Sequence, residues 1–153
     1  MRTTTLLLAL GLLLPVAAAA QQMAATGDYL LHYNALPSTQ LPEQITQRYG
    51  LMRSPQTVVL TVSLQKRGQP GAPRPVPADV EVTATDAEGR VPPLRMREVA
   101  AGSDVSYLGQ ARIGDDASEA LTFSIQARPR EGGAGSGQPP APLRATYRQD
   151  FFR

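Results

Sequence analysis

Apolar and polar side chains alternate with a period of two along most of this chain, and that rhythm constrains its fold more than any other feature. The clearest example is residues 57–66, where Val58, Leu60, Val62 and Leu64 share one face of an extended segment. Such alternation is typical of a strand with one face on an apolar core and the other in solvent. Six further segments repeat the pattern and are predicted strands: 28–35, 79–85, 94–99, 105–113, 119–128 and 144–152.

Turn residues separate these segments at short intervals. Residues 68–77 and 129–142 are rich in proline and glycine and are expected to be loops, because proline lacks the donor that a central strand needs. A short helix is predicted over residues 42–49, since Pro42 suits a first turn and Gly50 suits a stop. About seven strands, spaced about ten residues apart, predict an all-β fold. We expect an immunoglobulin-like antiparallel β-sandwich with one short helix after the first strand, and a small closed barrel is the alternative.

The first twenty residues follow a different pattern from the rest. Arg2 is followed by an unbroken apolar run over residues 6–14, and small residues at 18–20 precede Gln21. This order is typical of a secretory signal peptide. The apolar run is about half as long as the roughly 20 residues of a membrane-spanning helix, so we expect no membrane anchor in the mature form. The predicted divisions are a cleavable signal over residues 1–20, cut between Ala20 and Gln21, a short flexible N-terminus over 21–26, and one sandwich domain over 27–153.

The chain contains no cysteine and a single histidine, His32. It therefore has no disulfide framework, no thiolate zinc site and no cysteine nucleophile. Its formal net charge is +2, and the arginines and carboxylates are interspersed along the chain. Because no block of like charge is present, we expect no nucleic-acid partner.

Several short stretches, spread over the expected mature chain, carry a resemblance to one family. They are Gly27-Asp28-Tyr29, His32-Tyr33-Asn34-Ala35, Tyr49-Gly50-Leu51, Arg53-Ser54, Leu121-Thr122-Phe123 and Phe151-Phe152. These residues are similar to a family of small exported bacterial proteins described only as a domain of unknown function, DUF4426. The resemblance implies an all-β, immunoglobulin-like domain behind a signal peptide in the periplasm of a Gram-negative envelope, and it implies no activity, cofactor or catalytic residue. The chain departs from the family in a longer loop over residues 131–142.

His32 is the candidate catalytic residue. Its imidazole could act as a general base, with Ser38 or Ser54 as the nucleophile and Asp28 as the group that orients the ring. On the first predicted strand, however, His32 falls on the face opposite Leu31, and a lone histidine on a strand is usually a structural or surface residue. A hydrolase using His32 is therefore the alternative function.

Two other patterns have features of ligand sites. Oxygen ligands gather at Asp115, Asp116 and Glu119, but their spacing does not match a calcium-binding loop. The glycines of residues 132–137 are followed by Gln138 and two prolines, whereas a P-loop requires a lysine and a hydroxyl residue there. We expect no metal site and no cofactor.

The excursion over residues 34–54 is a candidate recognition surface. Arginine and tyrosine anchor protein interfaces more often than most residues do, and both occur beside the predicted helix. The alternative is a structural plug over one end of the sandwich, in which Arg53 binds backbone carbonyl groups. The candidate surface consists of Tyr33, Asn34, Ser38, Tyr49, Arg53 and Ser54.

Since the sequence holds no convincing catalytic set, the expected function is a non-enzymatic binding or accessory module. Its expected partner is an envelope protein or another envelope component, contacted through a sheet edge or through the excursion. The alternatives are the hydrolase and a structural or chaperone-like subunit of an envelope assembly. We expect the periplasm as its location, with full secretion left open.

Overall fold

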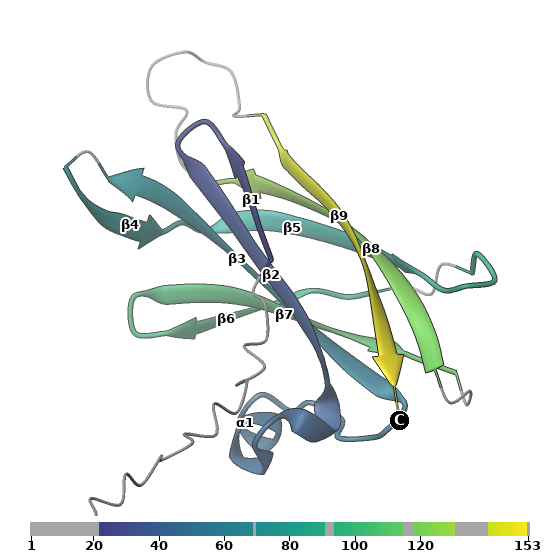
Figure 1. Cartoon of the computed structure of the whole chain (residues 1–153). Helices are drawn as coiled ribbons and strands as arrows, with labels where there is room; N and C mark the ends of the chain where they lie inside the picture. The colour runs from purple at the N-terminus through teal and green to yellow at the C-terminus, as the bar shows by residue number, and fades with distance from the viewer. Residues whose placement is uncertain (1–21, 69, 91–93, 115–117, 131–140, 153) are drawn as a thin grey trace, which may run out of the picture.

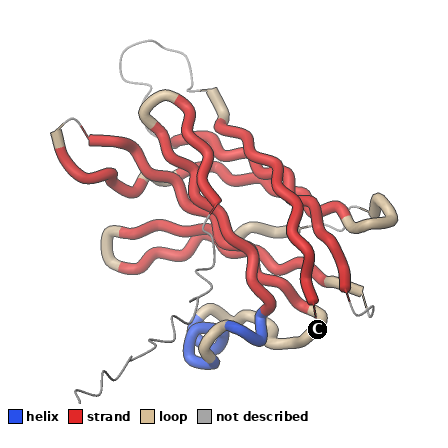
Figure 2. Tube along the Cα trace, viewed as in Figure 1, coloured by secondary structure: helices blue, strands red, loops and turns tan. Residues whose placement is uncertain are grey.

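The computed structural model describes residues 22–68, 70–90, 94–114, 118–130 and 141–152, which form two antiparallel β-sheets packed face to face (Figures 1 and 2). The large sheet contains, in spatial order, β1 (Gln22–Thr26), β2 (Tyr29–Pro37), β3 (Thr57–Gly68), β7 (Asp104–Arg112) and β6 (Arg97–Ala101), and β4 (Gly71–Pro75) pairs with β3. The small sheet contains β5 (Ala78–Thr85), β8 (Ser118–Pro129) and β9 (Leu143–Phe152), in that order.

The predicted all-β sandwich is confirmed, with nine strands in the described residues instead of about seven. The first additional strand is β1, which lies where a short flexible N-terminus was expected. It pairs with β2 through a two-residue turn, because Thr26 stands opposite Tyr29 and Gly27 adopts a positive φ of 56°. A Gly-Asp pair is a known hairpin signal. The pattern of side chains does not predict β1, because this short strand is mostly exposed and lacks alternation.

The second additional strand, β4, lies inside the segment expected to be a proline-rich loop. It pairs only with the last residues of β3, from Gln65 to Gly68, and the register shifts between Lys66 and Gly68. This position agrees with the reasoning that proline is excluded from central strands, because β4 lies off the main path of the sheet.

The strand predicted over residues 94–99 lies three residues later, as β6. Leu94 and Met96 still pack against the core, in agreement with the alternation. The segment that carries them is not part of β6, but it passes close to Gly109 of β7. A Cβ atom on Gly109 would lie 2.5 Å from the Met96 sulfur. The missing side chain of this glycine therefore lets the segment approach β7 closely.

The core lies between the two sheets and is built from the predicted inward faces. From the large sheet, Leu31, Leu60 and Val62 are fully buried, and Leu121 and Phe123 from the small sheet meet them. No helix in the described part of the chain is long and apolar enough to cross a bilayer.

The predicted helix is confirmed between β2 and β3, where η1 (Ser38–Gln40) precedes α1 (Glu43–Arg48). The carbonyl oxygen of Pro42 accepts the first hydrogen bonds of α1, from Ile45 and Thr46. Gly50 ends the helical segment with a positive φ of 58°. Figure 1 shows α1 at one end of the sandwich, below the end of β2. We call residues 38–56 the α1 excursion.

Candidate functional site

The two ends of the α1 excursion are fastened to each other by side chains that the sequence had suggested for recognition. Ser38 is fully buried, and its hydroxyl group donates to the carbonyl oxygen of Ser54 at 2.9 Å and accepts from the Ser54 amide at 2.9 Å. The Arg53 guanidinium group donates to the carbonyl oxygen of Thr39 at 2.8 Å. These bonds are those expected of a structural plug, because the side chains of Ser38 and Arg53 bind backbone groups of the excursion itself.

Two further residues of the predicted surface lie away from it or at its border. Tyr33 is buried between the sheets, and its ring centroid lies 5.0 Å from that of Tyr147 on β9. It therefore cannot belong to a recognition surface, and the alternation that pairs it with Leu31 already indicated this. Asn34 lies half-buried on the opposite face of β2, in register with Thr61 of β3.

An apolar pocket of about 190 Å³, the α1 pocket, lies between the α1 excursion and the outer face of the large sheet. Its roof consists of Leu41, Ile45, Tyr49 and Leu51 from the excursion. Its floor consists of Val59 and Thr61 from β3, Val99 and Ala101 from β6, and Ser106 and Leu108 from β7. Asp104, at the start of β7, lines it as well.

The sequence does contain a signal for this pocket. Leu41, Ile45 and Tyr49 recur every four residues, which places them on one side of a helical turn. On β3, Val59 belongs to the face that points away from the core, yet only 3% of it is exposed. An apolar helix side and an apolar outer sheet face must each be shielded from water, and here the two pack against each other.

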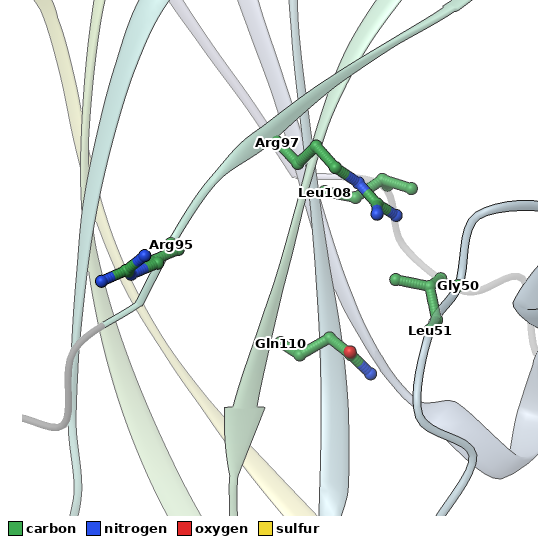
Figure 3. A pocket seen from close by; sticks show the side chains of 6 residues that line it. All are labelled: Gly50, Leu51, Arg95, Arg97, Leu108 and Gln110. Atoms are coloured by element: carbon green, nitrogen blue, oxygen red, sulfur yellow. The ribbon is translucent and has the colours of Figure 1, made fainter.

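A second, more polar pocket of about 380 Å³ adjoins the first, because both are lined by Leu51 and Leu108. We call it the arginine mouth, since Arg95 and Arg97 contribute to its wall. In Figure 3 the side chains of Arg97 and Gln110 reach from the sheet toward the loop at Gly50 and Leu51, whereas the Arg95 side chain points away from that loop.

Hydrogen bonds from the sheet hold that loop in place. The Arg97 guanidinium group donates to the carbonyl oxygen of Tyr49, at the end of α1. The Gln110 side chain donates to the Met52 carbonyl oxygen at 3.0 Å and accepts from the Met52 amide at 3.2 Å. The roof of the α1 pocket is thus attached to the sheet that forms its floor.

His32 and its proposed partners are not brought together. Ser38 follows the end of β2, six positions after His32, which corresponds to about 20 Å in an extended strand, and Ser54 is bonded to Ser38. In register with His32 are Met23 on β1 and Ser63 on β3. The Nε2 atom of His32 is buried and has no hydrogen-bond partner among the described residues.

The two other patterns, which the sequence does not support as ligand sites, fall largely outside the described residues. Asp115 and Asp116 lie there, and so do the glycines of residues 132–137. Glu119 is described, and its carboxylate accepts a hydrogen bond from the backbone amide of Gly114. Within the part of the chain that the structure covers, no three potential metal-ligating side chains gather.

Comparison with known proteins identifies both a family and a fold. The family model described as "Domain of unknown function (DUF4426)" matches residues 23–152. The chain is similar to a crystal structure of a DUF4426 family protein (PA0388) from Pseudomonas aeruginosa PAO1, with a TM-score of 0.68 and 28% sequence identity over 86% of this chain and 94% of that one. No curated protein matches the sequence.

A second solved structure is FetP from uropathogenic E. coli strain F11, which was expressed recombinantly in the periplasm of E. coli BL21(DE3). It has a TM-score of 0.55 and 15% sequence identity, and it covers 87% of this chain and 94% of its own. At this identity the likeness shows a shared fold and nothing further.

Proposed function

The chain belongs to the DUF4426 family and shares its fold with a solved member of that family, and we propose that it is a binding or accessory module whose ligand enters the α1 pocket. The observation that carries this proposal is the pocket itself. Its roof and floor come from segments far apart in the sequence, and apolar side chains dominate both. An apolar cavity of about 150 Å³ can stay dry and bind a molecule the size of benzene. A volume of about 190 Å³ therefore suits an aromatic ring or a short alkyl chain.

The groups that line the two pockets support binding rather than chemistry. The hydroxyl-bearing residues on the floor are Thr61 and Ser106, and no histidine lines either pocket to activate them. His32, the residue of the hydrolase alternative, lies elsewhere on β2. The proposed role is therefore non-enzymatic, in service of an envelope protein or another envelope component.

We further propose that the module works in the periplasm. The basic, apolar and small-residue order over residues 1–20 supports export. Those residues lie outside the described ones, so their role stays a proposal.

A photocrosslinker placed in the pocket tests the proposed function. We would install p-benzoylphenylalanine in place of Tyr49, express the full chain in its envelope, irradiate the cells and measure the intact mass of the recovered protein. The matched control carries the same group in place of Glu81, an exposed residue of β5 in the small sheet. We expect a discrete adduct from position 49 only.

A filled-pocket variant makes the experiment decisive. Val99 lies on the pocket floor at the edge strand β6, so Val99→Phe is expected to occupy the cavity, whereas Val99→Ala leaves it open. The adduct at position 49 should disappear in the first variant and persist in the second. Equal adduct from positions 49 and 81, or an adduct that survives Val99→Phe, would contradict binding in the pocket.

A further inference from the structure

We propose that the occupant of the α1 pocket is an amphipathic carboxylate, with a short apolar chain or ring in the pocket and its carboxylate at the arginine mouth. This inference rests on the proposed function, because it requires the pocket to be a binding site. Three features carry it: the size of the apolar space, the charge at one end and the opposite charge at the other.

The apolar space sets the size of the tail. If each heavy atom takes about the 30 Å³ that a water molecule occupies in the liquid, then about 190 Å³ holds roughly six atoms. The side chains that would contact the tail are aliphatic from below, at Val59, Val99 and Leu108, and both aliphatic and aromatic from above, at Ile45 and Tyr49. Such a wall favours methylene groups or a single ring.

The arginine mouth supplies the positive charge. Neither Arg95 nor Arg97 forms an ion pair with any residue that the structure describes. Arg97 uses part of its guanidinium group to bind the Tyr49 carbonyl oxygen, and a guanidinium carries five N–H donors. Donors therefore remain for a ligand, and charge-assisted bonds of this kind to a carboxylate are among the stronger hydrogen bonds in proteins.

The carboxylate closest to Arg97 in sequence is turned away and already bonded. Glu98 faces the other side of β6, where it accepts from the Arg130 guanidinium group at 2.7 Å and from the Tyr107 hydroxyl group at 3.2 Å. Since Glu98 is engaged there, the positive charge of Arg97 is available to an anionic ligand.

The acidic group of the α1 pocket lies on the side away from the mouth. Asp104 lines the apolar pocket beside Ala101, its partner at the end of the β6–β7 hairpin, and it does not line the arginine mouth. A negative group at one end and two positive groups at the other orient a charged ligand. An anionic head is repelled by Asp104 and attracted by Arg95 and Arg97, so the tail points toward the hairpin.

A series of straight-chain carboxylates tests this inference. Butanoate, hexanoate and octanoate would be titrated into the full chain, with binding followed by NMR chemical shifts and by calorimetry. Each methylene that enters the pocket should tighten binding about fourfold, the equivalent of about 0.8 kcal/mol. The gain should level off once about six carbons are buried. Octylamine in its cationic form and octanol serve as length-matched controls and should bind at least tenfold more weakly.

Variants separate the contributions of charge and cavity. Arg97→Gln removes the charge but keeps an amide that can donate to the Tyr49 carbonyl oxygen, so octanoate should bind about tenfold more weakly while octanol is unaffected. Arg95→Gln is the second charge variant, for use if the first lowers the melting temperature. Arg128→Gln changes an exposed arginine of β8 in the other sheet and should leave binding unchanged. Val99→Phe should abolish binding of every ligand.

The outcomes distinguish this inference from the proposed function. Equal binding of octanoate and octylamine, an unchanged affinity in both charge variants, or no shift with millimolar octanoate would overturn the carboxylate assignment. If the photocrosslink at position 49 still forms and is still blocked by Val99→Phe, the binding module stands with a different ligand. If that crosslink fails as well, both proposals are wrong.

Discussion

The most direct test of the excursion's architecture is the substitution Ser38→Ala. The Ser38 side chain is fully buried, and its hydroxyl group makes two hydrogen bonds at 2.9 Å, one to each backbone polar group of Ser54. Alanine removes both partners and fills almost the same volume, so the change isolates the two bonds from packing. The Ser54 carbonyl oxygen keeps a partner, because it also accepts from the Thr57 amide at 3.1 Å, so the Ser54 amide is the group that loses its bond. Leaving a buried polar group unpaired costs about 1–3 kcal/mol. Because Ser54 is half-buried and water can reach part of it, we expect a loss of about 2 kcal/mol.

Urea unfolding measures this loss. For a domain of this size the free energy of unfolding falls by about 2 kcal/mol per molar urea, so the midpoint should drop by about 1 M without a change in slope. Ser103→Ala is the matched control, because Ser103 is exposed in the turn between β6 and β7, and its effect should stay within about 0.5 kcal/mol.

The photocrosslink at position 49 adds a second readout. Loss of the Ser38 bonds should loosen the roof of the α1 pocket and reduce the adduct. A midpoint that moves no more for Ser38→Ala than for Ser103→Ala would refute the view that these bonds hold the excursion closed.

Three further predictions concern the core. Tyr107→Phe should cost about 1–3 kcal/mol by calorimetry, because the Tyr107 hydroxyl group accepts from the buried Ala78 amide at 2.8 Å and that donor would lose its partner. Tyr147→Phe should be neutral or stabilising at pH 7, since the Tyr147 hydroxyl group is buried without a partner among the described residues. Burial raises the pKa of both tyrosines in the folded chain above the unfolded value of about 10, so the free energy of unfolding is independent of these groups below that pH and falls as the pH rises above it. Each phenylalanine variant should therefore flatten the alkaline fall in unfolding free energy. Gly109→Ala should destabilise by about 1 kcal/mol, because its Cβ atom would displace the Met96 side chain and lie 3.4 Å from the Arg95 carbonyl oxygen; a urea midpoint equal to that of the parent would contradict this packing.

Much of the sandwich was predictable because burial between two sheets imposes a strict period of two. Val58, Leu60, Val62 and Leu64 alternate in sequence, and all four are buried. The helix was predictable for a local reason as well, since Pro42 and Gly50 determine where it begins and ends. Strand β1 was missed because its pairing depends on one tight turn rather than on its own pattern.

The candidate site was harder to predict because long-range contacts build it. The bonds from Arg97 to Tyr49 and from Gln110 to Met52 join residues 48 and 58 positions apart, and no local pattern indicates such pairs. Ser38 and Ser54 belong to the predicted recognition surface, yet a small hydroxyl residue can equally well form hydrogen bonds inside a tight turn. Only their burial in the fold distinguishes the two roles.

The α1 pocket remains where a helix of only six residues covers three strands. Its six residues span about 9 Å, whereas three adjacent strands present a floor about 10 Å wide before side chains are added. Larger floor residues could close the remaining space, but Ala101 and Ser106 are small. Protein interiors are normally packed to high density, and filling a cavity is a common way to gain stability. Small residues thus leave an apolar space beside two arginines that form no ion pair with any described residue, as the proposed carboxylate site requires.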